Sequence, residues 1–302
     1  MSDKELSQDQ KICQKMDAIG RKILIMSGKG GVGKTTVTVN IANALLAQGF
    51  SVGVLDTDIH GPNVAKMFGC EQNILMQTED GEIQPVSPRE NLKIVSLSFA
   101  LNTPTEAVVF RGPMKLSVIK QFLSDVAWGT LDYLLIDSPP GTGDEQLAVC
   151  QSIPAMTGAI IVTTPQEVAL LDARRSVSFA TQLDLDVIGV VENMSYLSCP
   201  DCGKHIPIFG TGGGKKLCEE YNLDLLGEIP MELSVREGED NGVNLIEGNT
   251  GVTAQKFMEI AKHIHKITKP SCSADIGYVP KGPECSPSSC ATCTQDCPSR
   301  KK

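Results

Sequence analysis

Residues 28–36, GKGGVGKTT, have the types and spacing needed to hold a phosphate chain. They fit the pattern G-x-x-x-x-G-K-[ST], in which glycines let backbone N–H groups approach phosphate oxygens. We expect Lys34 to contact the β- and γ-phosphates and Thr35 to place its hydroxyl on Mg²⁺. The pattern does not require the second lysine, Lys29. The residues predicted to bind nucleotide are Gly28, Lys29, Gly30, Gly31, Val32, Gly33, Lys34, Thr35 and Thr36.

Two aspartate-bearing loops offer the carboxylates that phosphoryl transfer needs. Asp137 follows an apolar run in LLIDSPPGTGD, and Asp56 and Asp58 lie in LDTDIHGPN. We expect Asp56 and Asp137 to organise Mg²⁺, and Asp58 to position the attacking water. Taken alone, each loop also fits a capped turn. The predicted catalytic residues are Lys29, Lys34, Asp58 and Asp137.

Cys199 and Cys202 form a C-x-x-C pair in SCPDCGKH. Two thiolates fill half of a four-ligand shell, and a symmetric dimer would supply the other half. Four cysteines suit a [4Fe–4S] cluster or tetrahedral Zn²⁺. His205 lies close enough in sequence to suggest zinc, although a lone histidine there is more often a loop residue. A thioredoxin-like redox pair is a further alternative, but Gly203 follows the second cysteine where such a pair normally opens a helix.

A second array lies near the C-terminus. The part C-x2-C-x3-C-P matches the latter part of a bacterial ferredoxin run, whereas the spacing from Cys285 departs from it. An iron–sulfur site, a zinc site and an unstructured thiol tail all remain as interpretations. The array consists of Cys285, Cys290, Cys293 and Cys297, and the remaining isolated cysteines, expected mostly as small buried residues, are Cys13, Cys70, Cys150, Cys218 and Cys272.

Strands and helices alternate along the chain and would position these residues. The expected strands are 22–27, 51–56, 131–137, 158–164 and 187–193, and the expected helices are 34–48, 113–127, 166–182 and 252–267. The continuous apolar runs indicate strands covered on both faces, and so an α/β domain with a mostly parallel sheet. Because ligands bind at the carboxyl ends of such strands, the glycine loop, Asp56, Asp137 and Asn193 should meet at one edge.

Composition sets further bounds. We expect a polar segment over 1–20, the nucleotide-binding domain over 21–268 and a cysteine-rich tail over 269–302. The net charge of −9 argues against a general nucleic-acid binder, and no apolar run is long enough to span a membrane. The polar N-terminus has no signal-peptide core, which indicates a reducing cytoplasm where eleven cysteines favour metal ligation over disulfides.

The motifs together carry a family resemblance. GKGGVGKTT resembles the deviant phosphate loop of the MinD/ParA/nitrogenase-iron-protein class, in which the first lysine, here Lys29, crosses a dimer interface to the partner's nucleotide. With LDTDIHGPN, YLLIDSPPGTGDEQL, IIVTTPQEVALLDARR, GVVENMSY and CPDC, residues 20–268 closely resemble the Mrp/ApbC/Nbp-type iron–sulfur cluster carrier ATPases.

This resemblance implies a homodimeric ATPase that assembles a [4Fe–4S] cluster and passes it to apoproteins, with assembly factors as further partners. It implies that Cys199 and Cys202 hold a cluster between subunits, and that Asn193 and Pro230 line the adenine. Nbp-type members carry a ferredoxin-like cysteine array at the N-terminus. Here the N-terminal region offers only Cys13 and the array lies at the other end.

Two other classes use the same ATP clamp. A MinD/ParA-type positioning ATPase would favour a basic amphipathic helix or a basic DNA-binding face, neither of which the cysteine-rich tail or the net charge suggests. A nitrogenase-iron-protein-like reductase would instead use the bridging cluster as an electron donor. Spectroscopic cycling of the cluster without loss of iron would favour the reductase.

Overall fold

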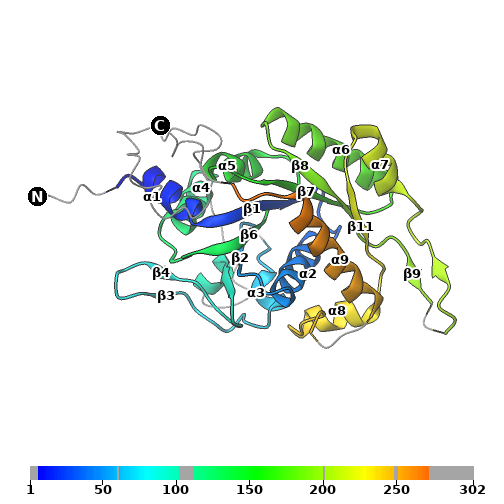
Figure 1. The fold of residues 1–302 in the computed structure, drawn as a ribbon, viewed down its shortest axis with the longest axis horizontal. Coiled ribbons are helices and arrows are strands. Elements are labelled where there is room, and N and C mark those ends of the chain that lie inside the picture. The colour runs from blue at the N-terminus through cyan, green and yellow to red at the C-terminus, as the bar shows by residue number, and fades with distance from the viewer. Residues whose placement is uncertain (1–5, 60, 102–111, 200, 248–250, 272–302) are drawn as a thin grey trace, which may run out of the picture.

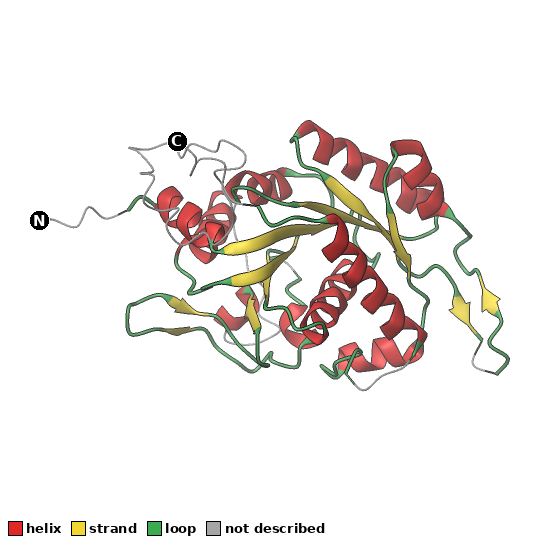
Figure 2. Ribbon diagram, viewed as in Figure 1, coloured by secondary structure: helices red, strands yellow, loops and turns green. Residues whose placement is uncertain are grey.

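A seven-stranded parallel sheet forms the centre of the molecule (Figures 1 and 2). The computed structural model describes residues 6–59, 61–101, 112–199, 201–247 and 251–271. The strands are β1 (Ile19–Met26), β2 (Val52–Asp56), β5 (Leu92–Val95), β6 (Leu131–Asp137), β7 (Gly158–Thr163), β8 (Val187–Glu192) and β11 (Leu225–Glu228). Their order is β11-β8-β7-β1-β6-β2-β5, and all neighbours run parallel. The expected α/β class is confirmed.

Helices cover both faces of this sheet. One face carries α2 (Lys34–Ala47), α3 (Val64–Met67), α8 (Leu233–Asp240) and α9 (Val252–Ile267). The other carries α1 (Gln8–Asp17), α4 (Gly112–Ser124), α5 (Asp144–Ser152), α6 (Glu167–Gln182) and α7 (Gly213–Tyr221). A 3₁₀ turn, η1 (Leu97–Ala100), follows β5.

The apolar runs form strands because both sides of the sheet are buried. In β1, Ile23 and Ile25 pack in the core on the α2 side, whereas Leu24 and Met26 pack in the core on the α6 side. Side chains alternate between the two faces of a strand, so both sets must be apolar. This packing on both faces holds the carboxyl end of β1, from which the phosphate loop starts, in place.

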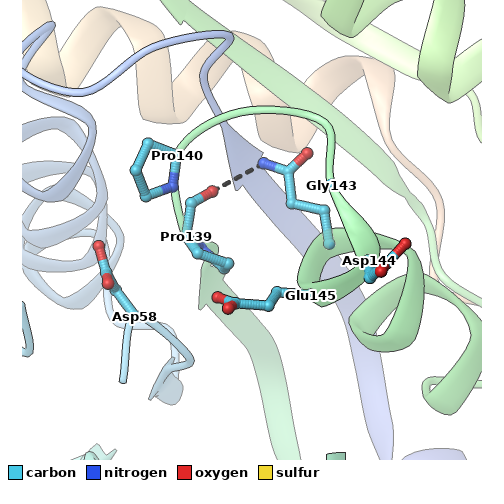
Figure 3. Close-up of a pocket in the computed structure, with 7 residues that line it drawn as sticks. Asp58, Pro139, Pro140, Gly143, Asp144 and Glu145 are labelled. Atoms are coloured by element: carbon cyan, nitrogen blue, oxygen red, sulfur yellow. Dashed lines mark hydrogen bonds between the residues drawn. The ribbon is translucent and has the colours of Figure 1, made fainter. Parts of the chain in front are cut away.

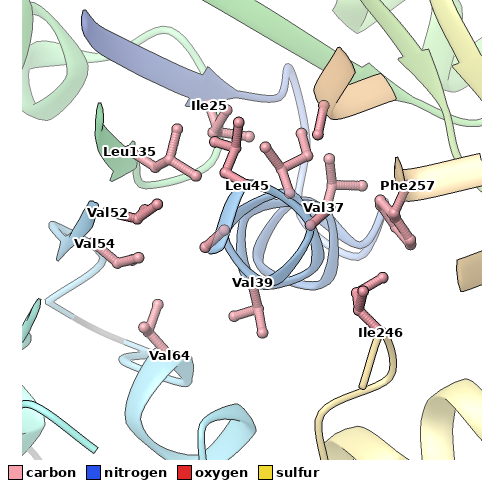
Figure 4. Packing of buried hydrophobic residues seen from close by; sticks show 14 of the residues in the cluster. Ile25, Val37, Val39, Leu45, Val52, Val54, Val64, Leu135, Ile246 and Phe257 are labelled. Atoms are coloured by element: carbon pink, nitrogen blue, oxygen red, sulfur yellow. The ribbon is translucent and has the colours of Figure 1, made fainter. Parts of the chain in front are cut away.

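Helix α2 is held firmly against the sheet (Figure 4). Val37, Ile41 and Leu45 are fully buried, and Phe257 of α9 packs beside them. This burial fixes the direction of α2, whose first residue is the phosphate-loop lysine Lys34. The nucleotide site is therefore built on a rigid helix and a rigid strand.

The N-terminal segment contributes to the core. Ser7 caps α1 and forms a reciprocal capping box with Gln10. Ile12 and Met16 of α1 are buried beside α4, and β1 already begins at Ile19. The polar segment predicted over residues 1–20 thus contains an amphipathic helix, α1, which packs on the domain.

Two small antiparallel hairpins extend from the body. The first pairs β3 (Met76–Gln77) with β4 (Ile83–Gln84), and the second pairs β9 (Leu197–Ser198) with β10 (His205–Ile206). The β9–β10 hairpin projects beyond β11, away from the helices (Figure 1). It follows β8 and carries Cys199 and Cys202.

The last described residues return to the start of the sheet. Lys22 is fully buried, and its ammonium donates to the carbonyl oxygens of Met16 (3.2 Å), Ile19 (3.1 Å) and Ser271 (2.8 Å). The amide of Ser271 donates to the carbonyl of Gly20 at 2.8 Å. The last described residue, Ser271, therefore lies beside the amino-terminal end of β1.

Candidate functional site

The glycine loop joins β1 to α2 in the order that the motif requires. Gly33 has a φ of 81°, and a Cβ there would lie 2.1 Å from the Asn193 side-chain nitrogen. Only glycine fits such a position. The Asn193 amide in turn donates to the carbonyl of Val32 at 2.9 Å. Asn193, predicted on the base side, is thus brought directly against the phosphate loop.

Asp137 is the centre of a buried polar network at the start of α2. Lys34 lies 2.7 Å from one of its carboxylate oxygens, and the Thr35 hydroxyl donates to the same oxygen at 2.8 Å. The Thr38 hydroxyl donates to the other oxygen at 2.6 Å. The predicted Lys34, Thr35 and Asp137 are therefore brought together. Thr38 was missed, although it lies one turn after Lys34, where it faces the same strand.

Asp56 lies beside Asp137 at the same edge of the sheet. The two are paired in the parallel register of β2 and β6, and both are almost fully buried. Burial and then the negative charge of Asp137 raise the pKa of Asp56 to about 8. The Ser96 hydroxyl and the Asp58 amide both donate to Asp56, each at 3.1 Å. Two adjacent carboxylates with the Thr35 hydroxyl form an all-oxygen donor set of the kind that Mg²⁺ prefers.

Asp58 lines a pocket of about 450 Å³ next to this edge (Figure 3). Its carboxylate accepts from the Gly61 amide at 3.3 Å. The rest of the pocket comes from the loop after β6 and the first turn of α5: Pro139, Pro140, Gly143, Asp144, Glu145 and Gln146. The Gln146 amide donates to the Pro139 carbonyl at 2.8 Å, which fixes the loop. Asp58 therefore lines an open pocket next to the carboxyl ends of β2 and β6.

Lys29 points sideways from the loop toward α6. Its ammonium donates to the side-chain oxygen of Gln166, the N-cap residue of α6, at 3.4 Å. Val168 and Leu171, on the first turns of that helix, are 68% and 51% exposed. Lys29 thus lies near an exposed apolar surface rather than in the pocket that Asp58 lines.

Asn193 and Pro230 are held in one neighbourhood by backbone bonds. The Ile229 amide donates to the Glu192 carbonyl (2.8 Å), and the Ser195 amide donates to the Ile229 carbonyl (2.9 Å). The segments after β8 and β11 therefore run side by side. Glu192, which the sequence did not single out, is buried and accepts from the Ser195 hydroxyl at 2.5 Å and from the Gly214 amide at the start of α7.

The hairpin presents its cysteines to solvent. Cys202 is exposed and Cys199 is partly exposed. The amide of Cys199 donates to the Lys204 carbonyl at 3.0 Å, which closes the turn. Hydrogen bonds from the amides of Cys202 and Asp201 lower the pKa of Cys199. A lowered thiol pKa favours the thiolate, the form that binds metal.

The side chain of His205 packs on an aromatic ring. Its ring stacks on Tyr196, with ring centroids 3.9 Å apart and an angle of 18° between the planes. Across the described residues, no group of three or more His, Cys, Asp or Glu side chains is placed to hold a metal ion. Within one chain, the hairpin thus carries two cysteines, Cys199 and Cys202, that are at least partly exposed.

The other cysteines divide as follows. Cys13, Cys70 and Cys218 are buried, and Cys150 is partly buried, as expected for small apolar residues. The four-cysteine array of the tail, Cys285, Cys290, Cys293 and Cys297, lies outside the described residues together with Cys272. Among the described helices, none is long and apolar enough to cross a membrane.

One family model and several known proteins match most of this chain. Residues 18–265 match the family model described as "ParA: NUBPL iron-transfer P-loop NTPase". An iron-sulfur cluster carrier protein of Methanocaldococcus jannaschii is 49% identical over 257 residues, which cover 85% of this chain and 88% of that protein. A cytosolic Fe-S cluster assembly factor NUBP1 homolog of Caenorhabditis briggsae is 44% identical over 261 residues, 84% of this chain and 83% of its own.

Solved structures show the same fold. A nucleotide-binding protein of Archaeoglobus fulgidus in complex with ADP has a TM-score of 0.70 and 38% identity, and the match covers 78% of this chain and 92% of that chain. The cell division ATPase MinD of Pyrococcus furiosus has a TM-score of 0.59 at 24% identity, with 82% and 99% covered. The second likeness concerns the fold alone.

Proposed function

Because the chain belongs to the family of NUBPL iron-transfer P-loop NTPases, we propose that it is an ATP-hydrolysing carrier that assembles a [4Fe–4S] cluster and passes it to apoproteins as a homodimer. One observation carries this proposal. The phosphate loop and the segment that leads into the Cys199–Cys202 hairpin lie at the same edge of the sheet, joined by the Asn193 side chain and the Val32 carbonyl. A change at the nucleotide can thus reach the root of the hairpin.

The nucleotide half of the function follows from the phosphate loop. Backbone N–H groups at the start of α2 hold phosphate oxygens, and Lys34 supplies positive charge where negative charge develops during transfer. Thr35, Asp56 and Asp137 are the residues that would hold Mg²⁺, which neutralises phosphate charge. Asp58 orients the attacking water from the pocket. The buried side chains of β1 and α2 keep these groups in fixed positions.

The dimer would complete both sites. Lys29 would extend from its position beside Gln166 to the partner's nucleotide, in the manner of an arginine finger. The exposed Val168 and Leu171 supply apolar surface beside it. Two copies of Cys199 and Cys202 give the four thiolates of a [4Fe–4S] site on a two-fold axis.

The partners and the location are proposed from the relatives. Proteins named iron-sulfur cluster carriers and a cytosolic assembly factor cover most of this chain. We therefore expect apo iron–sulfur proteins and assembly factors as partners, in the cytoplasm. The net charge of −9 disfavours nucleic acid as a partner.

Anaerobic reconstitution tests the proposal. Four full-length proteins are loaded with iron and sulfide. They are wild type, the double variant Cys199→Ala/Cys202→Ala, the variant with Cys285, Cys290, Cys293 and Cys297 changed to Ser, and the variant that combines both sets of substitutions. Bound iron, acid-labile sulfide, visible absorption and molar mass are then measured. We expect the first variant to lose about four iron atoms per dimer and to keep ADP binding. Full iron and sulfide in a variant lacking both Cys199 and Cys202, once the tail cysteines are also replaced, would overturn the cluster assignment.

A further inference from the structure

Helix α8 is attached to the first turn of α2 by one carboxylate. The Thr36 hydroxyl donates to Glu239 at 2.9 Å, and the Asn40 side chain donates to the other oxygen of Glu239 at 3.0 Å. Thr36 and Asn40 are one helical turn apart, so both present their side chains to α8. Thr36 is the third residue of α2, within the turn whose free N–H groups face phosphate.

This carboxylate has no cation beside it in the part of the chain that the structure describes. The ion pairs of α8 are made by Arg236, which contacts Glu237 and Asp240, both on the exposed side. Glu239 is instead half-buried against α2, and burial raises its pKa. A partly desolvated negative charge therefore lies against the helix turn that receives a polyphosphate.

We propose that Glu239 is a positioning residue that weakens nucleotide binding and so sets how readily the site releases its nucleotide. Its charge opposes the phosphates across the first turn of α2. It also holds the hydroxyl of Thr36, which has one proton to donate and so cannot serve Glu239 and a phosphate oxygen at once. Nucleotide binding therefore competes with the contact that attaches α8 to α2.

The competition has a structural consequence on the base side. Pro230, expected beside the adenine, lies three residues before the first residue of α8. Release of Thr36 from Glu239 leaves Asn40 as the remaining donor of α2 to this carboxylate, while Val235 keeps α8 packed in the core on the α2 side. The segment that precedes α8 is therefore next to a contact that changes with the nucleotide. This inference rests on the nucleotide site alone and does not depend on the cluster.

The test compares Glu239→Gln with Glu237→Gln in the full-length protein. Both remove one negative charge from α8, but Glu237 is exposed and paired with Arg236. Affinity for ADP is measured by titration at low and high salt. We expect Glu239→Gln to bind ADP roughly fivefold more tightly at low salt, since a charge several ångströms from a phosphate at an intermediate effective dielectric contributes about that factor. The gain should shrink at about 1 M salt.

Glu237→Gln should bind ADP as wild type does. An unchanged ADP affinity in a folded Glu239→Gln protein, or an equal gain in Glu237→Gln, would overturn the proposal. If Glu239→Gln does not fold, Glu239→Ala is tested with the same expectation. Because these measurements use no iron, their failure leaves the cluster-carrier proposal standing, and loss of the cluster leaves this one standing.

Discussion

At the scale of single residues, the phosphate site brings two carboxyl groups next to each other. Asp56 and Asp137 are adjacent and buried, with Lys34 as the nearby counter-charge. Such an arrangement costs folding free energy in exchange for a site prepared for a cation. From the residue types and their place after apolar runs, the sequence predicted that Asp56 and Asp137 would lie at one edge of the sheet. It did not predict that Thr38 would donate to Asp137, because that contact depends on how α2 packs on β6.

We predict that Asp56→Asn stabilises the nucleotide-free protein at high pH. The pKa of Asp56 is about 8 in the folded protein, against 3.8 for an ordinary aspartate, so the folded state binds the proton more tightly. Stability contributed by this group falls as pH rises from about 4 to about 8 and stays low above that range. Without Mg²⁺ and at pH 8.5, we expect a gain of about 2 kcal/mol, a rise of roughly 4–8 °C in Tm.

The control is Asp80→Asn, at an exposed position in the turn between β3 and β4. Its Tm should stay close to that of wild type. Thermal unfolding of both variants and wild type is followed at pH 4.5 and pH 8.5 in the presence of a chelator. The gain in Tm of Asp56→Asn should disappear at the lower pH. A gain of equal size at both values would mean that the carboxylate is not protonated in this way. ATP hydrolysis should fall strongly in Asp56→Asn.

At the scale of elements, the loop between β1 and α2 depends on its glycines for different reasons. Gly31 and Gly33 both have a φ of 81°, but only at Gly33 would a Cβ overlap another residue, Asn193. At Gly30, φ is not positive and a Cβ would meet nothing within 4 Å. Substitution by alanine should therefore have graded effects along the loop.

We predict that Gly33→Ala lowers the unfolding free energy by about 2–4 kcal/mol, Gly31→Ala by about 1 kcal/mol, and Gly30→Ala by less than about 0.5 kcal/mol. Denaturant titration of the nucleotide-free proteins provides the measurement. Equal losses in all three variants would show that the overlap with Asn193 does not matter.

The sequence predicted long, periodic elements well. The strand at 131–137 and the helix at 252–267 were placed with the bounds that the structure gives, because their apolar residues face a core throughout. Short elements such as β5, β11 and the hairpin of β9 and β10 were missed. Their residues are few, and their stability comes from neighbours distant in sequence. The contact of Glu239 with Thr36 joins residues 203 positions apart, so no local pattern could reveal it.

At the scale of the whole molecule, the surface beside the phosphate loop is the face that we propose for a second subunit. Lys29, Val168 and Leu171 are grouped beside the phosphate loop, and the cysteine hairpin projects from the same sheet edge. The resemblance of the phosphate loop to the MinD/ParA class suggested an exchange of lysines. The structure of one chain adds the exposed apolar residues next to that lysine.

We predict that Lys29→Ala lowers ATP hydrolysis about 100-fold or more, as expected for loss of a charge supplied across an interface. ADP affinity should stay within about threefold of wild type, because Lys34 and the backbone amides remain. Lys215→Ala, at an exposed lysine of α7, is the matched control and should retain hydrolysis. Hydrolysis is measured across protein concentrations, with molar mass from light scattering. A normal rate in Lys29→Ala would remove the lysine from the mechanism.

Lys22 holds the first residues of the tail in place. By binding the Ser271 carbonyl at the amino-terminal end of β1, it starts the tail on the pole of the domain opposite the Cys199–Cys202 hairpin. Fourteen peptide steps separate Ser271 from Cys285, a contour of at most about 48 Å. Strand β1, with eight residues, is about 26 Å long. The spacer is therefore longer than β1, and deletions within it would show whether the thiols of the tail have to reach the Cys199–Cys202 hairpin.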